Sequence, residues 1–244
     1  MKHLQTVLRI VMNNRLKGQV KMLNTYKVVE KFTSINGEGK KAGQLAVFIR
    51  FAGCNLNCIY CDTRWANEKD VPYTLMTSDE IYNYIKETGI KNVTLTGGEP
   101  LLQEGIMELL LKLSKDNNLY IEIETNGSID IKKFRNIKNP PSFTIDYKLD
   151  CSGMESKMCM NNYYEITQKD TVKFVAGSTD DLNKAKEIID RYDLTNKTSV
   201  YISPVFGKLA PEKIVEFMID NRLNNVNLQI QMHKVIWAPD QRGV

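Results

Sequence analysis

Strand-like and helix-like segments alternate along most of this chain, and that alternation limits the folds open to it. Strand-like runs lie at 28–33, 46–51, 93–96, 120–125, 143–147, 172–175, 200–202 and 228–232. A capping box formed by Thr77 and Glu80 begins a helix that ends at Gly89, and further helices are expected from Pro100 and at 180–192 and 211–222. The apolar face of the Pro100 helix comprises Leu102, Ile106, Leu109, Leu110 and Leu113. This pattern predicts an α/β fold with mostly parallel strands and crossover helices.

Length and charge indicate one soluble domain with an unusual N-terminus. A chain of 244 residues can bury one large core, and 42% hydrophobic residues without a long apolar run predict no membrane span. Residues 1–24 carry five Lys and Arg and no acid, so the remaining 28 basic residues face 29 acidic ones. That balance predicts no nucleic-acid partner. We expect 25–244 to form a single domain, and 1–24 to be an extension that is disordered or non-native, with Met22 as the natural start.

Three of the five cysteines, Cys54, Cys58 and Cys61, fall within eight residues with the spacing C-x3-C-x2-C. Thiolates are soft ligands that suit iron–sulfur clusters, zinc or copper(I). Three ligands are one short of a closed zinc site or a four-cysteine cluster. A cubane cluster held by three cysteines leaves one iron open to a substrate, whereas a zinc knuckle would need a distant His or Cys. Both interpretations remain open on spacing alone.

The other two cysteines, Cys151 and Cys159, are expected to be ordinary, partly buried residues. An odd cysteine count with three residues clustered argues against a disulfide framework. It favours a reducing compartment, so we expect a cytoplasmic protein.

With Tyr60 as the aromatic residue, the cysteine motif resembles the C-x3-C-x-aromatic-C signature of the radical S-adenosylmethionine (SAM) superfamily. The resemblance implies a partial TIM-like (β/α) barrel and a [4Fe-4S] cluster whose open iron binds the amino and carboxylate groups of SAM. An electron from the reduced cluster then cleaves SAM to a 5′-deoxyadenosyl radical. The superfamily's G-G-E-P motif, which binds the SAM amino group, is matched by 97–100. The implied SAM-binding residues are Tyr60, Asp62, Gly97, Gly98, Glu99, Thr125, Asn126, Asp146, Tyr147 and Lys148.

Four of these motifs lie at the carboxyl ends of expected strands: the cysteine loop, 97–100, 125–127 and 146–148. The carboxyl ends of parallel strands meet at one edge, where active sites of such folds lie. We therefore expect the four motifs to converge on one site; the alternative for 125–127 taken alone is a simple type I′ turn.

Four segments carry a more specific resemblance, to the 7-carboxy-7-deazaguanine synthase family: 32–39, 48–56, 61–63 and 231–237. It implies a radical ring contraction of 6-carboxy-5,6,7,8-tetrahydropterin to 7-carboxy-7-deazaguanine, with loss of ammonia, for 7-deazapurine (queuosine) biosynthesis. In this reaction the radical abstracts the C6 hydrogen and SAM is regenerated. The resemblance also implies Mg2+, a homodimer and an electron donor such as flavodoxin or ferredoxin. The alternatives are a glycyl-radical activating enzyme and a non-enzymatic zinc or redox-sensing module.

The implied substrate contacts have plausible chemistry in this sequence. Glu38 can accept the guanidine-like N–H face of the pterin, and the forked donors of Arg50 suit its carboxylate. Thr63 is the implied Mg2+ ligand, although a helix-capping role would also explain it. Asn36 stands where the family usually has Gln. The implied substrate-binding residues are Ile35, Asn36, Gly37, Glu38, Arg50, Thr96, His233 and Val244.

Overall fold

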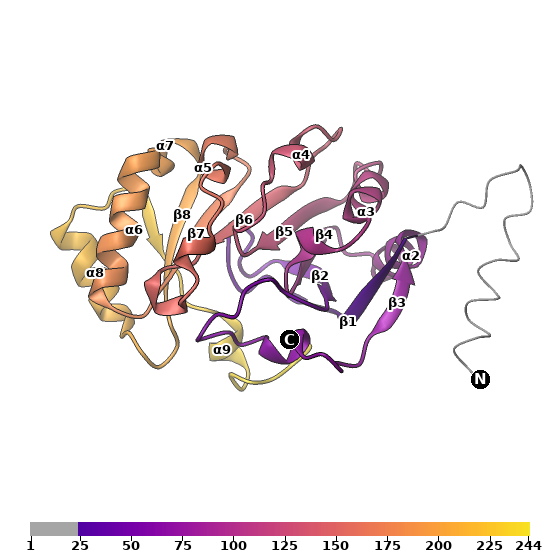
Figure 1. The fold of residues 1–244 in the computed structure, drawn as a ribbon, viewed down its shortest axis with the longest axis horizontal. Helices are drawn as coiled ribbons and strands as arrows, with labels where there is room; N and C mark the ends of the chain where they lie inside the picture. The colour runs from indigo at the N-terminus through magenta and orange to yellow at the C-terminus, as the bar shows by residue number, and fades with distance from the viewer. Residues whose placement is uncertain (1–23) are drawn as a thin grey trace, which may run out of the picture.

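One nine-stranded sheet organises residues 24–244, the part of the chain described by this computed structural model (Figure 1). The strand order is β3-β1-β2-β4-β5-β6-β7-β8-β9; β1 pairs antiparallel with its two neighbours, and the pairs from β2 to β9 are parallel. The strands are β1 (Thr25–Ile35), β2 (Leu45–Phe51), β3 (Thr74–Thr77), β4 (Asn92–Gly97), β5 (Tyr120–Thr125), β6 (Ser142–Tyr147), β7 (Thr171–Ala176), β8 (Ser199–Pro204) and β9 (Val226–Leu228). The predicted, mostly parallel α/β architecture is confirmed. The extension expected at 1–24 lies outside the described residues, apart from Asn24.

Helices connect the parallel strands and lie along the outer side of the sheet, whereas the cysteine loop, α9 and the C-terminus lie on its other side (Figure 1). The α-helices are α2 (Ser78–Thr88), α3 (Ile106–Leu113), α4 (Lys132–Arg135), α5 (Asn162–Glu165), α6 (Thr179–Tyr192), α7 (Leu194–Lys197), α8 (Pro211–Asp220) and α9 (His233–Ile236). The 3-10 helices are η1 (Arg64–Asn67), η2 (Pro100–Leu102), η3 (Asp150–Ser152) and η4 (Glu155–Lys157). Within 24–244, no helix has the length and apolar character needed to cross a membrane.

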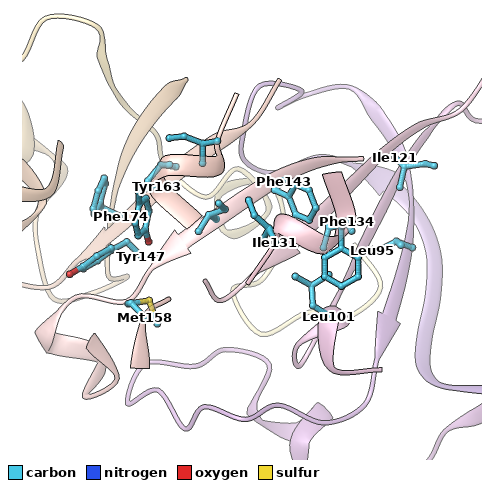
Figure 2. Packing of buried hydrophobic residues seen from close by; sticks show 14 of the residues in the cluster. Leu95, Leu101, Ile121, Ile131, Phe134, Phe143, Tyr147, Met158, Tyr163 and Phe174 are labelled. Atoms are coloured by element: carbon cyan, nitrogen blue, oxygen red, sulfur yellow. The ribbon is translucent and has the colours of Figure 1, made fainter. Parts of the chain in front are cut away.

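Side chains on the parallel strands alternate between an apolar outer face and a polar inner face. In β5, Ile121 and Ile123 pack into the hydrophobic core, whereas Glu122 and Glu124 contact Thr144 and Thr96 on the neighbouring strands. Figure 2 shows the apolar layer, which is rich in aromatic rings. Parallel strands covered on both faces usually read as continuous apolar runs. The alternation therefore shows that the inner face of this sheet surrounds polar space rather than a second core.

Two local predictions are wrong. The helix expected from Pro100 is split into η2 and α3, because Gly105 adopts a left-handed φ of 73° at the N-cap of α3. Leu102 is consequently 44% exposed and does not share the buried face. The strand expected at 228–232 lies earlier, at Val226–Leu228, and the side chain of the next residue, Gln229, accepts a hydrogen bond from the Gly39 amide that fastens the β1–β2 loop.

Candidate active site

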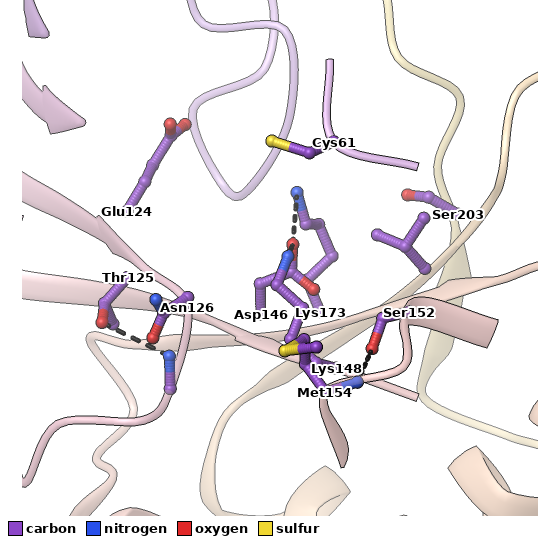
Figure 3. A network of polar contacts seen from close by, with 12 residues as sticks. Cys61, Glu124, Thr125, Asn126, Asp146, Lys148, Ser152, Met154, Lys173 and Ser203 are labelled. Carbon is purple, nitrogen blue, oxygen red and sulfur yellow. Dashed lines mark hydrogen bonds and ion pairs between the residues drawn. The ribbon is translucent and has the colours of Figure 1, made fainter. Parts of the chain in front are cut away.

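A cavity of about 1070 Å³ lies at the carboxyl ends of the parallel strands. It is lined by all three clustered cysteines, by Gly97 and Gly98, by Thr125 and Asn126, and by Asp146 and Lys148. The four strand-end motifs therefore converge on one site, as expected. The volume lies at the upper end of the range for single-ligand pockets, so it can take more than one small molecule. Figure 3 shows Cys61, Glu124, Asn126, Asp146 and Lys173 around this space.

Three hydrogen bonds hold the cysteine loop in place. Arg64 Nη2 donates to the Cys58 carbonyl at 2.9 Å, and the Ile59 amide donates to the Ser152 carbonyl at 3.0 Å. The Gly53 amide donates to the Ala66 carbonyl at 3.1 Å. These contacts tie the loop to η1 and η3, so the thiols are presented on a fixed backbone.

The three thiols suit a cubane cluster. The Leu56 amide and Asn126 Nδ2 each lie 3.4 Å from Cys54 Sγ, as donors that would stabilise a cluster-bound thiolate. Burial raises the pKa of Cys54 and Cys58, so cluster assembly must displace their protons. Among the described residues, no three His, Cys, Asp or Glu side chains converge to hold one metal ion. A cubane does not require such convergence, because each thiolate binds a different iron.

The glycines of the 97–100 motif are required because neighbouring backbone leaves no space for a side chain. A Cβ on Gly97 would lie 2.3 Å from the Phe51 carbonyl oxygen, and one on Gly98 would lie 1.9 Å from the Gly53 carbonyl oxygen. The Gly98 and Glu99 amides donate to those same carbonyls at 3.0 and 2.9 Å. The glycines therefore allow the end of β4 to pack against the start of the cysteine loop.

Glu99 braces the loop after β5. One carboxylate oxygen accepts from Thr125 Oγ1 at 2.9 Å and the Leu101 amide at 3.0 Å, and the other accepts from the Asn126 amide at 2.7 Å. Glu99 is fully buried, and this burial raises its pKa to about 7. Both carboxylate oxygens of Glu99 are occupied by these hydrogen bonds, and the residue does not line the cavity. Its role is therefore to position Thr125 and Asn126.

A row of alternating charges on the cavity wall runs from β6 through β7 to the loop after β1, and Figure 3 shows its members Asp146, Lys148 and Lys173. Lys148 Nζ lies 2.8 Å from Asp146 Oδ2, and Lys173 Nζ lies 3.6 Å from the same oxygen. Lys173 Nζ also lies 2.9 Å from Glu38 Oε2. Burial alone would lower the pKa of both lysines, but the neighbouring carboxylates outweigh it and raise the pKa. Both lysines are therefore cations at neutral pH.

Arg50 and Thr96 line the cavity beside this row, and each has an acidic partner. Arg50 Nε lies 3.0 Å from Oε2 of Glu30, the residue directly opposite it in the pairing of β1 with β2. That ion pair occupies Nε, and neither Nη atom has a hydrogen-bond partner within 24–244. Thr96 Oγ1 donates to Glu124 Oε2 at 2.7 Å, and burial raises the pKa of Glu124.

The C-terminal segment closes the opposite wall. His233 begins α9, and its Nδ1 would lie 3.0 Å from a Cβ on Gly37, so the ring packs tightly against this glycine. Burial lowers the pKa of His233, which favours the neutral ring. Lys234 Nζ lies 3.3 Å from Asp62 Oδ2 and thereby joins α9 to the cysteine loop. Val244, the last residue of the sequence, also lines the cavity.

Thr63 also lines the cavity, and its hydroxyl lies 3.7 Å from Cys61 Sγ. It occupies the N-cap of η1, but its side chain makes no capping hydrogen bond. The capping alternative is therefore wrong for the hydroxyl, which is available to a ligand.

Three of the predicted contact residues do not line the cavity. Tyr147 is 2% exposed and packs in the core on the outer face, where its hydroxyl donates to Glu155. Asn36 is buried behind the wall and accepts from Thr94 Oγ1 at 2.9 Å, and Glu99 has the bracing role described above. Tyr147 and Asn36 miss the cavity because the direction of the backbone at each residue points its side chain away from the cavity.

Several cavity residues were missed from sequence: Glu30, Glu124, Lys173 and Lys234. A signal for two of them was present. The runs 121–125 and 171–174 alternate apolar and polar residues although flanking helices predicted burial on both faces. A charged residue at an inner position of such a strand indicates polar space in the centre of the fold.

Unpartnered polar atoms support ligand binding at this site. Tyr60 Oη, Asn67 Oδ1 and Asp146 Oδ1 are buried, belong to cavity-lining residues and have no hydrogen-bond partner within the described chain. Burying such atoms without partners is costly. Polar groups of SAM or the substrate would satisfy them, so the residues present fit a cluster-bound cosubstrate.

Known proteins share both the sequence and the fold. The Radical SAM superfamily model matches residues 48–152. The 7-carboxy-7-deazaguanine synthase of Clostridium acetobutylicum is 66% identical over 219 residues, which cover 90% of this chain and 99% of that protein. The synthase of Chlorobaculum tepidum is 37% identical over 220 residues, covering 89% and 96%.

Structural comparison confirms the fold. The crystal structure of QueE from Escherichia coli superposes with a TM-score of 0.68 at 23% identity, over 86% of this chain and 95% of that one. Together the matches support the synthase interpretation and not the activating enzyme or the zinc module. The chain therefore belongs to the 7-carboxy-7-deazaguanine synthase family of radical SAM enzymes.

Proposed function

We propose that this enzyme converts 6-carboxy-5,6,7,8-tetrahydropterin to 7-carboxy-7-deazaguanine and ammonia. The observation that carries the proposal is that Glu38 and Arg50 line the same cavity as the three clustered cysteines. A carboxylate and a forked cation on one wall match the two polar ends of a carboxypterin. An activating enzyme, which must admit a protein segment, has no need of this pair.

The cysteine side of the cavity would hold the cofactors. When bound, the cluster and SAM supply the 5′-deoxyadenosyl radical that starts the rearrangement. Cys54, Cys58 and Cys61 would ligate the cluster, while Asn126 and the Leu56 amide donate toward Cys54. Asp146 has one free carboxylate oxygen and would accept from SAM.

The β1–β2 side would hold the pterin. Glu38 accepts its N–H face, and the two Nη atoms of Arg50 donate to its carboxylate while Glu30 fixes the guanidinium through Nε. Neutral His233 and Thr96 supply further hydrogen bonds. The β1–β2 side and the C-terminal segment of the cavity would exclude water from the reacting carbon. The charged side chains that bind the pterin would hold that carbon close to the cosubstrate.

Magnesium would bind at Thr63, whose hydroxyl is not used as a cap. Mg2+ keeps several waters and takes few protein ligands, so one hydroxyl together with substrate oxygens is a sufficient set. The proposed partners are a small electron-transfer protein, such as flavodoxin or ferredoxin, and a second copy of the chain in a homodimer. We propose a cytoplasmic location, where a reduced cluster and free thiols persist.

The decisive experiment is to incubate reduced, cluster-loaded protein with SAM, Mg2+ and the carboxypterin and to detect the deazaguanine by mass. Glu38→Gln and Arg50→Ala are expected to keep their iron and bind SAM while losing carboxypterin affinity, roughly tenfold to a hundredfold each. Arg50→Lys should recover part of the loss, since a point charge lacks the fork. Unchanged carboxypterin binding in both variants would refute the proposal.

A further inference from the structure

Lys173 occupies the centre of the charged row although no motif marks it in the sequence. It lies on β7, where inner and outer side chains alternate, and its neighbours Val172 and Phe174 pack in the core. Its own side chain is 12% exposed and lines the cavity. A lysine at such a position is rare unless its charge is paired, because burial of an ammonium group is costly.

The partners of Lys173 are unequal. Glu38 has an ion pair with Lys173 at 2.9 Å, and its other oxygen lies 3.4 Å from Ser203 Oγ, a weak contact. Asp146 is 3.6 Å from Lys173 but has a closer cation, Lys148, at 2.8 Å. Loss of Lys173 would therefore leave Glu38 without a cation within the described residues, whereas Asp146 would keep one.

The pairing also fixes the direction of the Glu38 carboxylate. Glu38 lies in the loop after β1, and its side chain is only 12% exposed because Lys173 and Ser203 hold it against β7 and β8. One oxygen is occupied by Lys173 and the other is nearly free. A carboxylate held in this way presents an acceptor in a fixed direction. A mobile carboxylate would lose side-chain conformational entropy when the substrate binds, and this loss would weaken binding.

We propose that Lys173 is a positioning residue that holds the Glu38 carboxylate oriented for the substrate, without binding the substrate itself. The inference rests on the proposed function, since it assigns Lys173 a role in recognising the same pterin. It predicts that the effect of Lys173 on affinity passes through Glu38.

A double-mutant cycle on the cluster-loaded enzyme tests this relationship. Lys173→Met keeps the length of the side chain and removes the charge, and it is expected to weaken carboxypterin binding roughly tenfold to a hundredfold. In the Glu38→Gln background the same change should have little effect, because position 38 no longer carries a charge to be held. SAM affinity should change less than carboxypterin affinity in Lys173→Met, since Asp146 keeps Lys148.

Two further variants control for folding and for charge. Lys173→Arg keeps the cation and should recover part of the lost affinity with normal iron content. Lys213→Met removes an exposed lysine that pairs with Glu216 on α8, and it should leave both affinities unchanged. Melting temperature and iron content identify any variant that has failed to fold.

The outcomes separate the two ideas. A wild-type enzyme that does not bind the carboxypterin would overturn the proposed function and this inference with it. If the wild type binds and Lys173→Met loses the same factor in the wild-type and the Glu38→Gln backgrounds, Lys173 contacts the substrate directly and the positioning role is wrong. Unchanged affinity in Lys173→Met would likewise overturn it.

Discussion

The guanidinium of Arg242 lies over the ring of Trp65, with its central carbon 3.9 Å from the ring centroid. Trp65 belongs to η1, which follows the cysteine loop, and Arg242 belongs to the tail that forms part of the cavity wall. This contact therefore fastens the last residues of the chain to the element that holds the cluster ligands.

Arg242→Ala should loosen this wall. A cation–π contact at an exposed position contributes about 0.5–1 kcal/mol, so we expect the KM for the carboxypterin to rise about two- to fivefold. Trp65→Ala should have a similar effect, and the double variant should be no worse than either single one, because both remove the same contact. Steady-state kinetics provide the measurement, and additive losses would contradict the assignment.

Each cysteine of the 54–61 loop should be indispensable for the cluster. Cys54→Ala, Cys58→Ala and Cys61→Ala are expected to lose iron, sulfide and the brown colour after anaerobic reconstitution. Cys151→Ala and Cys159→Ala serve as controls and should keep all three; Cys151 Sγ, for example, donates to the Val175 carbonyl at 3.6 Å. Iron loss in either control would show that the ligand assignment is wrong.

Thr63→Ala should raise the Mg2+ concentration required for half-maximal turnover, because it removes the one hydroxyl proposed to bind the ion. SAM binding should persist. Thr63→Ser keeps a hydroxyl and is expected to restore much of the wild-type magnesium dependence. Turnover measured across a magnesium titration decides the matter, and identical curves for wild type and Thr63→Ala would remove Thr63 from the metal site.

Gly97→Ala should be far more damaging than Gly89→Ala, because Gly89 also has a positive φ but has open space around it. A Cβ on Gly97, whose φ is 135°, would lie 2.3 and 2.4 Å from the Phe51 carbonyl oxygen and amide nitrogen. We expect a loss of at least about 3 kcal/mol in the free energy of unfolding. Gly89 has a φ of 68°, and a Cβ added to it would have nothing within 4 Å, so Gly89→Ala should cost only about 1 kcal/mol. Urea unfolding compares the two, and equal losses would show that backbone strain alone matters.

Glu122 gives a pH prediction. Burial raises its pKa to about 7, and the hydroxyl of Thr144 donates to its carboxylate. Between about pH 4.5 and pH 7, the unfolded chain releases this proton while the folded chain keeps it, so stability falls as pH rises through that window. The cost amounts to about 3 kcal/mol above pH 7.

Glu122→Gln should remove this cost, because the amide oxygen still accepts from Thr144 and does not ionise. The difference in unfolding free energy between the variant and the wild type should therefore grow from pH 5 to pH 7 in favour of the variant, and then remain constant. Denaturant unfolding at several pH values measures it, and a difference that does not change with pH would contradict the raised pKa.

The features that could be predicted from the sequence are those that depend on residues close together in the chain. The spacing of Cys54, Cys58 and Cys61 predicts a three-thiolate site, and the alternation of strands and helices predicts that four strand-end motifs meet at one edge. The capping box of Thr77 and Glu80 forms as predicted. These signals are local, because ligand spacing, helix caps and strand periodicity are set within a few residues.

The partners of individual side chains could not be predicted in this way, because they depend on the folded domain. Glu38 meets Lys173, which lies 135 residues away, and Arg50 meets Glu30 through the register of β1 and β2. The requirement for Gly97 likewise comes from the Phe51 backbone on an adjacent strand. Such contacts depend on the order, register and parity of strands in the sheet, and these are fixed by the packing of the whole domain rather than by any short stretch of sequence.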